Sequence, residues 1–187
     1  VRFPLSVVSR DGNFIVASTD GTVLALEASS GRELWRANAG APLSAGVGSD
    51  GRFSAVVTRD NKLITFDGTK ELWRAQLNSR VSTAPLVGGE RVFVMGVDRA
   101  VHAFDALDGK RLWTLQRPGE ALTLLHIGVL TAVKGTLIAG QGPRLAGIDH
   151  RARLRNRARH HVDAAGDQVL HAGRGALRRH PRQRIRV

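Results

Sequence analysis

A unit of about 40 residues recurs along most of the chain, and this period constrains the fold more than any other feature. Residues 20–35 align without a gap with residues 98–113, and residues 60–73 repeat the unit with a turn two residues shorter. Each unit ends in a Leu-Trp pair, which places tryptophan at positions 35, 73 and 113, with spacings of 38 and 40 residues. A fixed period of this length is typical of solenoids and propellers.

Apolar residues alternate with a period of two inside each unit, which predicts β-strands rather than helices. In the first unit, strands are predicted at residues 14–19, 22–27 and 32–36, separated by turns at Asp20-Gly21 and Ser30-Gly31. A fourth strand of each unit is predicted from residues 42–47, 81–87 and 121–125. Four short antiparallel strands per unit predict an all-β fold, a β-propeller with one blade per unit.

The turn glycines and the tryptophans of the units have structural explanations. Gly31, Gly68 and Gly109 lie in tight turns, where a residue without a Cβ adopts positive φ at no steric cost. Trp35, Trp73 and Trp113 recur at equal spacing on the third predicted strand of each blade. Because a buried indole contributes roughly 150 to 250 Å² of contact, we expect these tryptophans to pack one blade against the next.

A fourth unit begins and then loses the pattern. Residues 136–140 and 143–149 repeat the first two strands, and Asp149 stands where Glu27, Asp67 and Asp105 stand in the other units. The spacing predicts glycine near 153 and tryptophan at 157, but both positions are arginine. The sequence therefore predicts a β-propeller fragment of about three and a half four-stranded antiparallel blades over residues 1–149.

The positive charge is concentrated after Asp149. The chain of 187 residues has a formal charge of +12, yet residues 150–187 alone hold 11 arginines, no lysine and two acidic residues. The preceding residues, with 17 basic and 14 acidic side chains, are close to neutral. Five of the seven histidines also lie in this Arg- and His-rich tail. The abrupt change in composition predicts a domain boundary at about Asp149.

Two interpretations of the tail remain open. An arginine-rich segment binds nucleic acid or anionic lipid by releasing counterions. Alternatively, arginine without lysine, beginning inside a repeat unit, is typical of a GC-rich gene read in a shifted frame. We favour a frame-shifted or disordered end and expect no nucleic-acid partner.

Catalytic, metal-binding and cofactor-binding residues are not predicted, and we expect that the protein is not an enzyme. The absence of cysteine excludes disulfides and thiolate metal sites, and no apolar run approaches the ~20 residues of a membrane-spanning helix. Residues 46–51 fit the pattern G-x-G-x-x-G, but a strand rather than a helix is predicted to follow, so we interpret them as an inter-blade turn. His102 and His126 stand alone and are expected to be half-buried packing residues.

The unit x-Ala-x-Asp-Ala-x-(Thr/Ser/Asp)-Gly-(Lys/Arg)-x-Leu-Trp resembles the pyrroloquinoline-quinone-type propeller repeat, and residues 105–113 match it almost fully. Within that superfamily, residues 81–87, 98–113 and 141–149 most resemble the family of propeller lipoproteins that serve the outer-membrane β-barrel assembly machinery. The resemblance covers residues 1–149 and none of the tail.

This resemblance implies a non-enzymatic, eight-bladed scaffold without a cofactor, which assists the insertion of β-barrel proteins from the periplasmic face of the outer membrane. The implied partners are the barrel-forming central subunit and unfolded outer-membrane proteins. The family's lipidated cysteine and signal are absent from this chain. Leu122 and Leu124 match the leucines of the family's Leu-x-Leu-Arg contact loop, with Leu125 replacing the arginine, and a buried strand pair is the alternative. A fragment of a quinone-dependent dehydrogenase is the alternative function.

Overall fold

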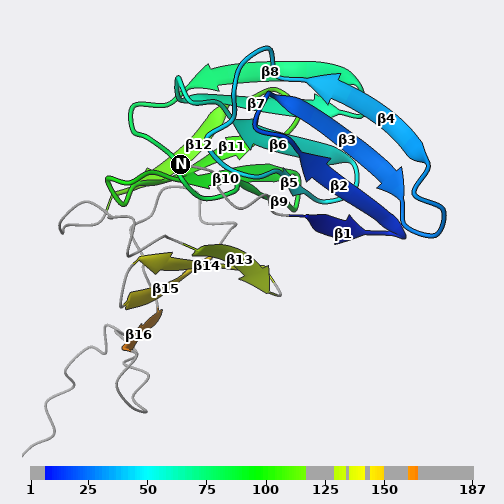
Figure 1. Ribbon diagram of the computed structural model, residues 1–187. Helices are drawn as coiled ribbons and strands as arrows, with labels where there is room; N and C mark the ends of the chain where they lie inside the picture. Colours follow the sequence, from blue (N-terminus) through cyan, green and yellow to red (C-terminus); the bar gives the residue numbers. More distant parts are fainter. Residues whose placement is uncertain (1–6, 117–128, 134, 142–143, 150–159, 164–187) are drawn as a thin grey trace, which may run out of the picture.

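The computed structural model describes residues 7–116, 129–133, 135–141, 144–149 and 160–163. Within these ranges the chain forms four antiparallel sheets of four strands each, with no helix. The sheets follow one another in chain order in Figure 1, from blue in the first sheet to olive and orange in the fourth. We call them blades 1 to 4.

Each blade is a simple meander in which consecutive strands pair. Blade 1 consists of β1 (Val8–Arg10), β2 (Asn13–Ala17), β3 (Thr22–Glu27) and β4 (Glu33–Asn38). Blade 2 consists of β5 (Gly48–Ser49), β6 (Phe53–Val57), β7 (Lys62–Asp67) and β8 (Lys70–Gln76). Blade 3 consists of β9 (Leu86–Gly88), β10 (Arg91–Met95), β11 (Val101–Asp105) and β12 (Arg111–Leu115). Blade 4 consists of β13 (Val129–Val133), β14 (Thr136–Gln141), β15 (Arg144–Asp149) and β16 (His160–Asp163).

The first strands of successive blades lie side by side. β1 contacts β5, β5 contacts β9, and β9 contacts β13. The first strand of each blade is therefore the innermost and the last strand the outermost, which is the arrangement of a β-propeller. The predicted all-β propeller fold is confirmed.

The grouping of the strands differs from the sequence prediction. Residues 42–47 form no strand and contain only an isolated bridge between Leu43 and Thr58. Of residues 81–87, only the last two belong to a strand, β9, which opens blade 3, and residues 121–125 lie outside the described residues. Residues 42–47 and most of 81–87 connect blades, and a short first strand (β1, β5 or β9) precedes the three predicted strands of blades 1 to 3, so the tryptophans lie on the fourth strand of a blade instead of the third. A period of two predicts a strand but does not say which neighbour it pairs with.

The connection between blades 1 and 2 is hydrogen-bonded to both. The backbone N–H of Leu43 donates to the carbonyl of Thr19 in blade 1 at 3.1 Å. On the other side, Arg59 of blade 2 donates to the carbonyl of Pro42 at 2.8 Å. The connection between blades 2 and 3 makes a hydrogen bond equivalent to that of Arg59. The backbone N–H of Val97 in blade 3 donates to the carbonyl of Arg80 at 2.8 Å. Backbone bonds therefore fix the relative position of neighbouring blades.

Blade 4 gains a strand that the repeat pattern did not predict. β16 pairs antiparallel with β15, from Gly147 opposite His160 to Arg144 opposite Asp163. A sheet edge offers unpaired N–H and C=O groups to any extended segment, whatever its side chains. The other tail residues lie outside the described residues, and the domain boundary at Asp149 stays a prediction.

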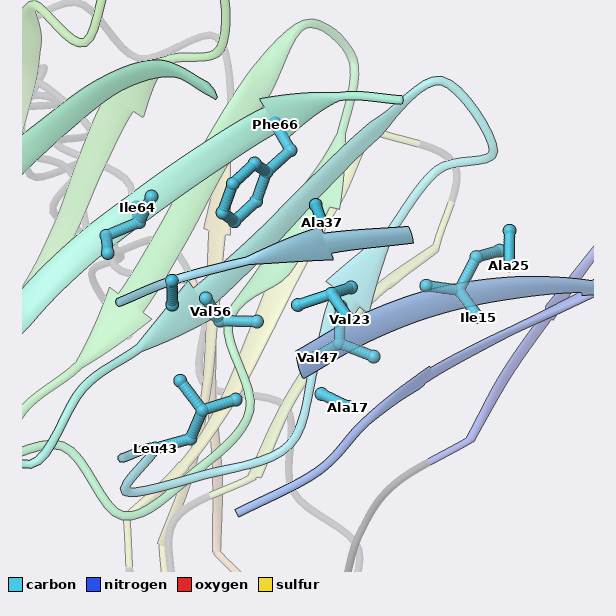
Figure 2. Close-up of a cluster of buried hydrophobic side chains, with 11 residues drawn as sticks. Ile15, Ala17, Val23, Ala25, Ala37, Leu43, Val47, Val56, Ile64 and Phe66 are labelled. Carbon is cyan, nitrogen blue, oxygen red and sulfur yellow. The ribbon is translucent and has the colours of Figure 1, made fainter. Parts of the chain in front are cut away.

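Three buried clusters form the core, each between two successive blades. The first joins Ile15, Val23 and Ala25 of blade 1 to Ile64 and Phe66 of blade 2, as Figure 2 shows. The second joins blades 2 and 3, and the third joins blades 3 and 4. Each internal contact packs one face of a blade against the opposite face of the next.

Candidate functional site

Trp73 is the best-defined contact between blades. It lies on the outermost strand of blade 2, and its indole N–H donates to the carbonyl of Ala106 in blade 3 at 2.9 Å. The indole ring lies against Gly109, where an added Cβ would come within 2.5 Å of the ring atom Cδ2. Its centroid is 5.9 Å from that of Phe104. Gly109 is therefore required both for its φ of 73° and for the space that the indole occupies.

The other two tryptophans occupy equivalent strands but have different surroundings. Trp113 is buried against Phe93, with centroids 5.9 Å apart, and its indole N–H meets no acceptor among the described residues. Trp35 is half-buried beside the first cluster. In the shorter turn of blade 2, Gly68 has a φ of 58° and a Cβ would meet nothing within 4 Å. Gly31, with a φ of 72°, likewise has open space around it.

One rim of the propeller is made of turns between the second and third strands of the blades. The carboxylate of Asp20 accepts the backbone N–H of Thr22 at 2.9 Å, and Asp98 accepts that of Ala100 at 3.1 Å. The backbone hydrogen bond from Thr22 lowers the pKa of Asp20 below its usual value. In blade 2, the Lys62 ammonium lies 2.7 Å from Asp60 and lowers the pKa of that carboxyl. Each turn thus uses its acid to hold its own residues in place.

The outermost strands of blades 1 and 2 carry matching ion pairs. Arg36 contacts Glu33 at 2.6 Å, and Arg74 contacts Glu71 at 2.5 Å. These hydrogen bonds lower the pKa of each glutamate and raise that of each arginine. All four side chains are at least partly exposed, so the pairs contribute little to stability.

His102 is largely buried in blade 3. Its Nδ1 lies 2.9 Å from Oγ1 of Thr114 on the neighbouring strand, and its ring packs 6.4 Å from Phe104. Burial, together with the charge of Arg111, lowers the pKa of His102. Among the described residues, no carboxylate hydrogen-bonds to its ring, so it does not form the centre of a catalytic triad there. His126 lies outside the described residues.

Residues 46–51 belong to a hairpin rather than to a phosphate-binding loop. They end the connection from blade 1, include the short strand β5, and are followed by β6, as the sequence predicted for that strand. The turn itself lies inside blade 2 and not between blades. In the part of the chain that the structure describes, no group of three His, Asp or Glu side chains is placed to hold a metal ion. No helix there is long and apolar enough to cross a membrane.

The predicted contact residues Leu122 and Leu124 lie outside the described residues, so their role stays a prediction. Gly48 is a close contact that sequence reasoning missed, because a Cβ there would lie 1.9 Å from the carbonyl oxygen of Pro85. The inner strands of blades 2 and 3 approach each other at this point. The sequence alone does not reveal such a contact, since it depends on how the blades sit together.

Comparison with known proteins identifies the family to which this repeat belongs. The family model described as outer membrane protein assembly factor BamB matches residues 19–169. The chain belongs to the BamB family. It is 42% identical over 141 residues to the outer membrane protein assembly factor BamB of Bordetella pertussis, and 33% identical over 141 residues to that of Burkholderia pseudomallei. These alignments cover 74% of the chain but only 36% and 37% of the relatives, so the chain spans about a third of their length.

Solved structures share the fold. BamB from Moraxella catarrhalis superimposes with a TM-score of 0.58 at 19% identity, over 85% of this chain and 64% of that one. The quinohemoprotein alcohol dehydrogenase from Comamonas testosteroni superimposes with a TM-score of 0.59 at 17% identity, over 79% of this chain and 33% of that one. At such identities the likeness concerns the propeller fold alone.

Proposed function

We propose that the chain is a non-enzymatic docking module that takes part in the assembly of outer-membrane proteins. The match of residues 19–169 to the model of an outer membrane protein assembly factor carries this proposal. The relatives that bear this name are up to 42% identical over most of the chain. Membership in their family supports the function more strongly than the shared fold does, because one propeller fold serves unrelated functions.

The described blades suit protein binding. β4, β8 and β12 are terminal strands of their sheets, so each leaves one row of backbone N–H and C=O groups available to an added strand. The turns beside Asp20, Asp60 and Asp98 form a rim in which each acid contacts residues of its own turn. This rim and the open strand edges suit the binding of an extended polypeptide, which needs no catalytic group.

The partners and the location belong to the same proposal. The barrel-forming central subunit of the assembly machinery is the proposed main partner, and unfolded outer-membrane proteins are the proposed clients. Leu122 and Leu124 are the proposed contact residues for the central subunit. The proposed location is the periplasmic face of the outer membrane, and a lipid anchor on a longer parent protein is part of that proposal.

A binding measurement tests the contact. The periplasmic region of the central subunit is titrated against the chain, against a variant with Leu122→Ala and Leu124→Ala, and against the control Leu107→Ala. Leu107 is 62% exposed on a turn of blade 3, so its loss should leave affinity unchanged. The double variant should bind roughly tenfold more weakly or worse. Equal affinity of the double variant and the unaltered chain would remove these leucines from the interface.

A separate assay tests the absence of enzymatic activity. The chain is incubated with pyrroloquinoline quinone, calcium and a primary alcohol, and reduction of a redox dye is followed. We expect no dye reduction above the rate without protein. Alcohol oxidation that depends on the quinone would overturn the docking proposal in favour of a dehydrogenase fragment.

A further inference from the structure

The contact between blades 2 and 3 contains a buried histidine. His102 lies on β11 opposite Val94 of β10, and Phe104 follows on the same face of the sheet. Val94 and Phe104 both belong to the cluster that joins blade 3 to blade 2, and His102 itself is 8% exposed. Among the described residues, it is the only buried side chain that can carry a charge. The imidazole therefore lies in the contact between the two blades.

The repeat does not require a histidine at this position. Leu24 of blade 1 and Ile64 of blade 2 occupy the equivalent place in their sheets, and each pairs, like His102, with a valine of the preceding strand. An aliphatic side chain at this place is thus compatible with the blade. Blade 3 differs from blades 1 and 2 by a group that accepts a proton, which the packing of a blade does not need.

The outermost strand of blade 3 also differs from those of blades 1 and 2. At the positions of the ion pairs described above, β12 has Arg111 in place of the glutamate and Thr114 in place of the arginine. The guanidinium carbon of Arg111 lies 5.5 Å from the centroid of the Phe104 ring. Oγ1 of Thr114 lies 2.9 Å from Nδ1 of His102. Blade 3 therefore has a cation where the other two blades have a carboxylate.

The surroundings of the imidazole favour its neutral form. Burial has the largest effect and lowers the pKa of His102, and the positive charge of Arg111 lowers it further. Asp98, in the turn before β11, acts in the opposite direction with a smaller effect. The blade 2 side chains of the cluster, such as Leu63 and Trp73, carry no charge, and neither do those of β10. Among the described residues, no carboxylate hydrogen-bonds to the ring.

We propose that His102 makes the contact between blades 2 and 3 sensitive to acid, so that protonation of its ring loosens this contact but not the contact between blades 1 and 2. A cation in an apolar contact without a paired carboxylate costs free energy. The hydroxyl of Thr114 does not offset this cost, since it donates to a neutral ring as well as it accepts from a protonated one. The hydrogen bond from Trp73 to Ala106 crosses the same contact and is expected to open with it.

Acid is expected to destabilise the folded chain because the pKa of His102 is lowered. The unfolded chain takes up this proton at the ordinary histidine value of 6.5, whereas the folded chain takes it up only at a lower pH. The stability contributed by the neutral ring is therefore complete above pH 6.5 and is lost as the pH falls toward the lowered pKa. Carboxyl groups titrate near 3.8 and 4.5, so histidines dominate between about pH 7.5 and about pH 5.5.

Urea denaturation of the unaltered chain and of His102→Leu at these two pH values tests the proposal. The variant has the residue that blade 1 has at this place, Leu24, so it is expected to fold. Both proteins keep all other histidines, and the difference between them reports on His102. Between about pH 7.5 and about pH 5.5 the folding equilibrium constant of the unaltered chain should fall roughly three- to tenfold more than that of His102→Leu.

Arg111→Glu tests the electrostatic cause separately. Arg111 is exposed, and the substitution gives blade 3 the residue type that blades 1 and 2 have at this position, Glu33 and Glu71. A carboxylate near the ring favours its protonated form, so the loss of stability in acid should shrink to roughly half or less of that in the unaltered chain. A histidine with a purely structural role would give the same pH profile in both proteins.

Hydrogen exchange at the two pH values locates the effect. Protection factors, corrected for the intrinsic exchange rate at each pH, should fall at least roughly threefold more in β10 and β11 than in β2 and β3. Three results would overturn the proposal. Equal losses in the unaltered chain and His102→Leu would assign the effect to other histidines. An unchanged loss in Arg111→Glu would contradict its electrostatic cause, and an equal fall of protection in all blades would show that the contact between blades 2 and 3 does not respond by itself.

Discussion

Blades 1 and 2 have similar apolar patterns but very different burial. Every residue of β6 is buried, as is the centre of β7 from Leu63 to Phe66. In β2 and β3, buried residues alternate with half-buried or exposed ones. Blade 2 lies between two neighbours, whereas blade 1 has one described neighbour. A residue's place in the array of blades, more than its own strand, therefore decides whether its side chain is buried.

A pair of phenylalanine substitutions gives the largest expected difference between these blades. Phe66 is 1% exposed in blade 2, and Phe14 is 38% exposed in blade 1. Phe66→Ala should lower the free energy of unfolding by about 3 to 5 kcal/mol, because it leaves a cavity between the blades. Phe14→Ala should cost less than about 1 kcal/mol. Urea denaturation measures both, and equal losses would contradict the difference in burial between the two phenylalanines.

Two turn glycines, one in blade 1 and one in blade 3, give the next largest expected difference in stability. Gly31→Ala and Gly109→Ala impose the same strain, since the two φ values are 72° and 73°. Only at Gly109 would the new Cβ also collide with the Trp73 ring, at 2.5 Å. Gly109→Ala should therefore destabilise by about 1 to 3 kcal/mol more than Gly31→Ala. If the two variants melt alike, the indole does not rest on Gly109.

Trp73→Phe isolates the hydrogen bond of the same contact. The substitution keeps an aromatic ring but removes the donor to the carbonyl of Ala106. We expect a loss of about 0.5 to 1.5 kcal/mol beyond the difference in ring size. Trp113→Phe is the matched control, because its indole N–H has no acceptor among the described residues. If Trp73→Phe lowered the free energy of unfolding less than Trp113→Phe does, the result would argue against the hydrogen bond to Ala106.

The smallest expected effect concerns the ion pairs on the outermost strands. Glu71 has a lowered pKa because of its hydrogen bond with Arg74, so its contribution to stability is present above the ordinary glutamate value of 4.5. It is lost as the pH falls through the lowered pKa. Glu71→Gln should reduce stability at pH 7 by about 0.5 kcal/mol and no longer do so at about pH 2. The urea midpoint at both pH values measures this, and a pH-independent difference would exclude the ion pair as the cause.

The sequence predicted the fold because a local signal was repeated. The period of two, the turn glycines and the regular tryptophans each predicted strands, and the period of the units predicted blades. The grouping of strands into blades was not predicted, because residues 42–47 and 81–87 carry a strand-like pattern yet mostly form connections. Pairing depends on contacts between distant residues, which a local pattern does not contain.

The site was less predictable than the fold. Trp73 and Gly109 stood out because they recur, but the carbonyl of Ala106 as an acceptor has no sequence signal. Gly48 resembled part of a phosphate-binding loop, while its position against Pro85 explains the glycine better. The exposure of Phe14 and its neighbours on the same face could not be predicted from the sequence either. These residues look like core, and only the arrangement of the blades leaves them uncovered.

Hydrogen exchange followed by mass spectrometry tests the central claim most directly, since it compares the blades within one molecule. At concentrations where the chain is monomeric, β6 and β7 should exchange most slowly, because blade 2 is packed on both faces. Exchange in β2 and β3 should be at least roughly tenfold faster, because among the described residues blade 1 has a neighbouring blade on one face only. Equal protection of the two blades in a monomer would contradict the claim that position in the array decides burial.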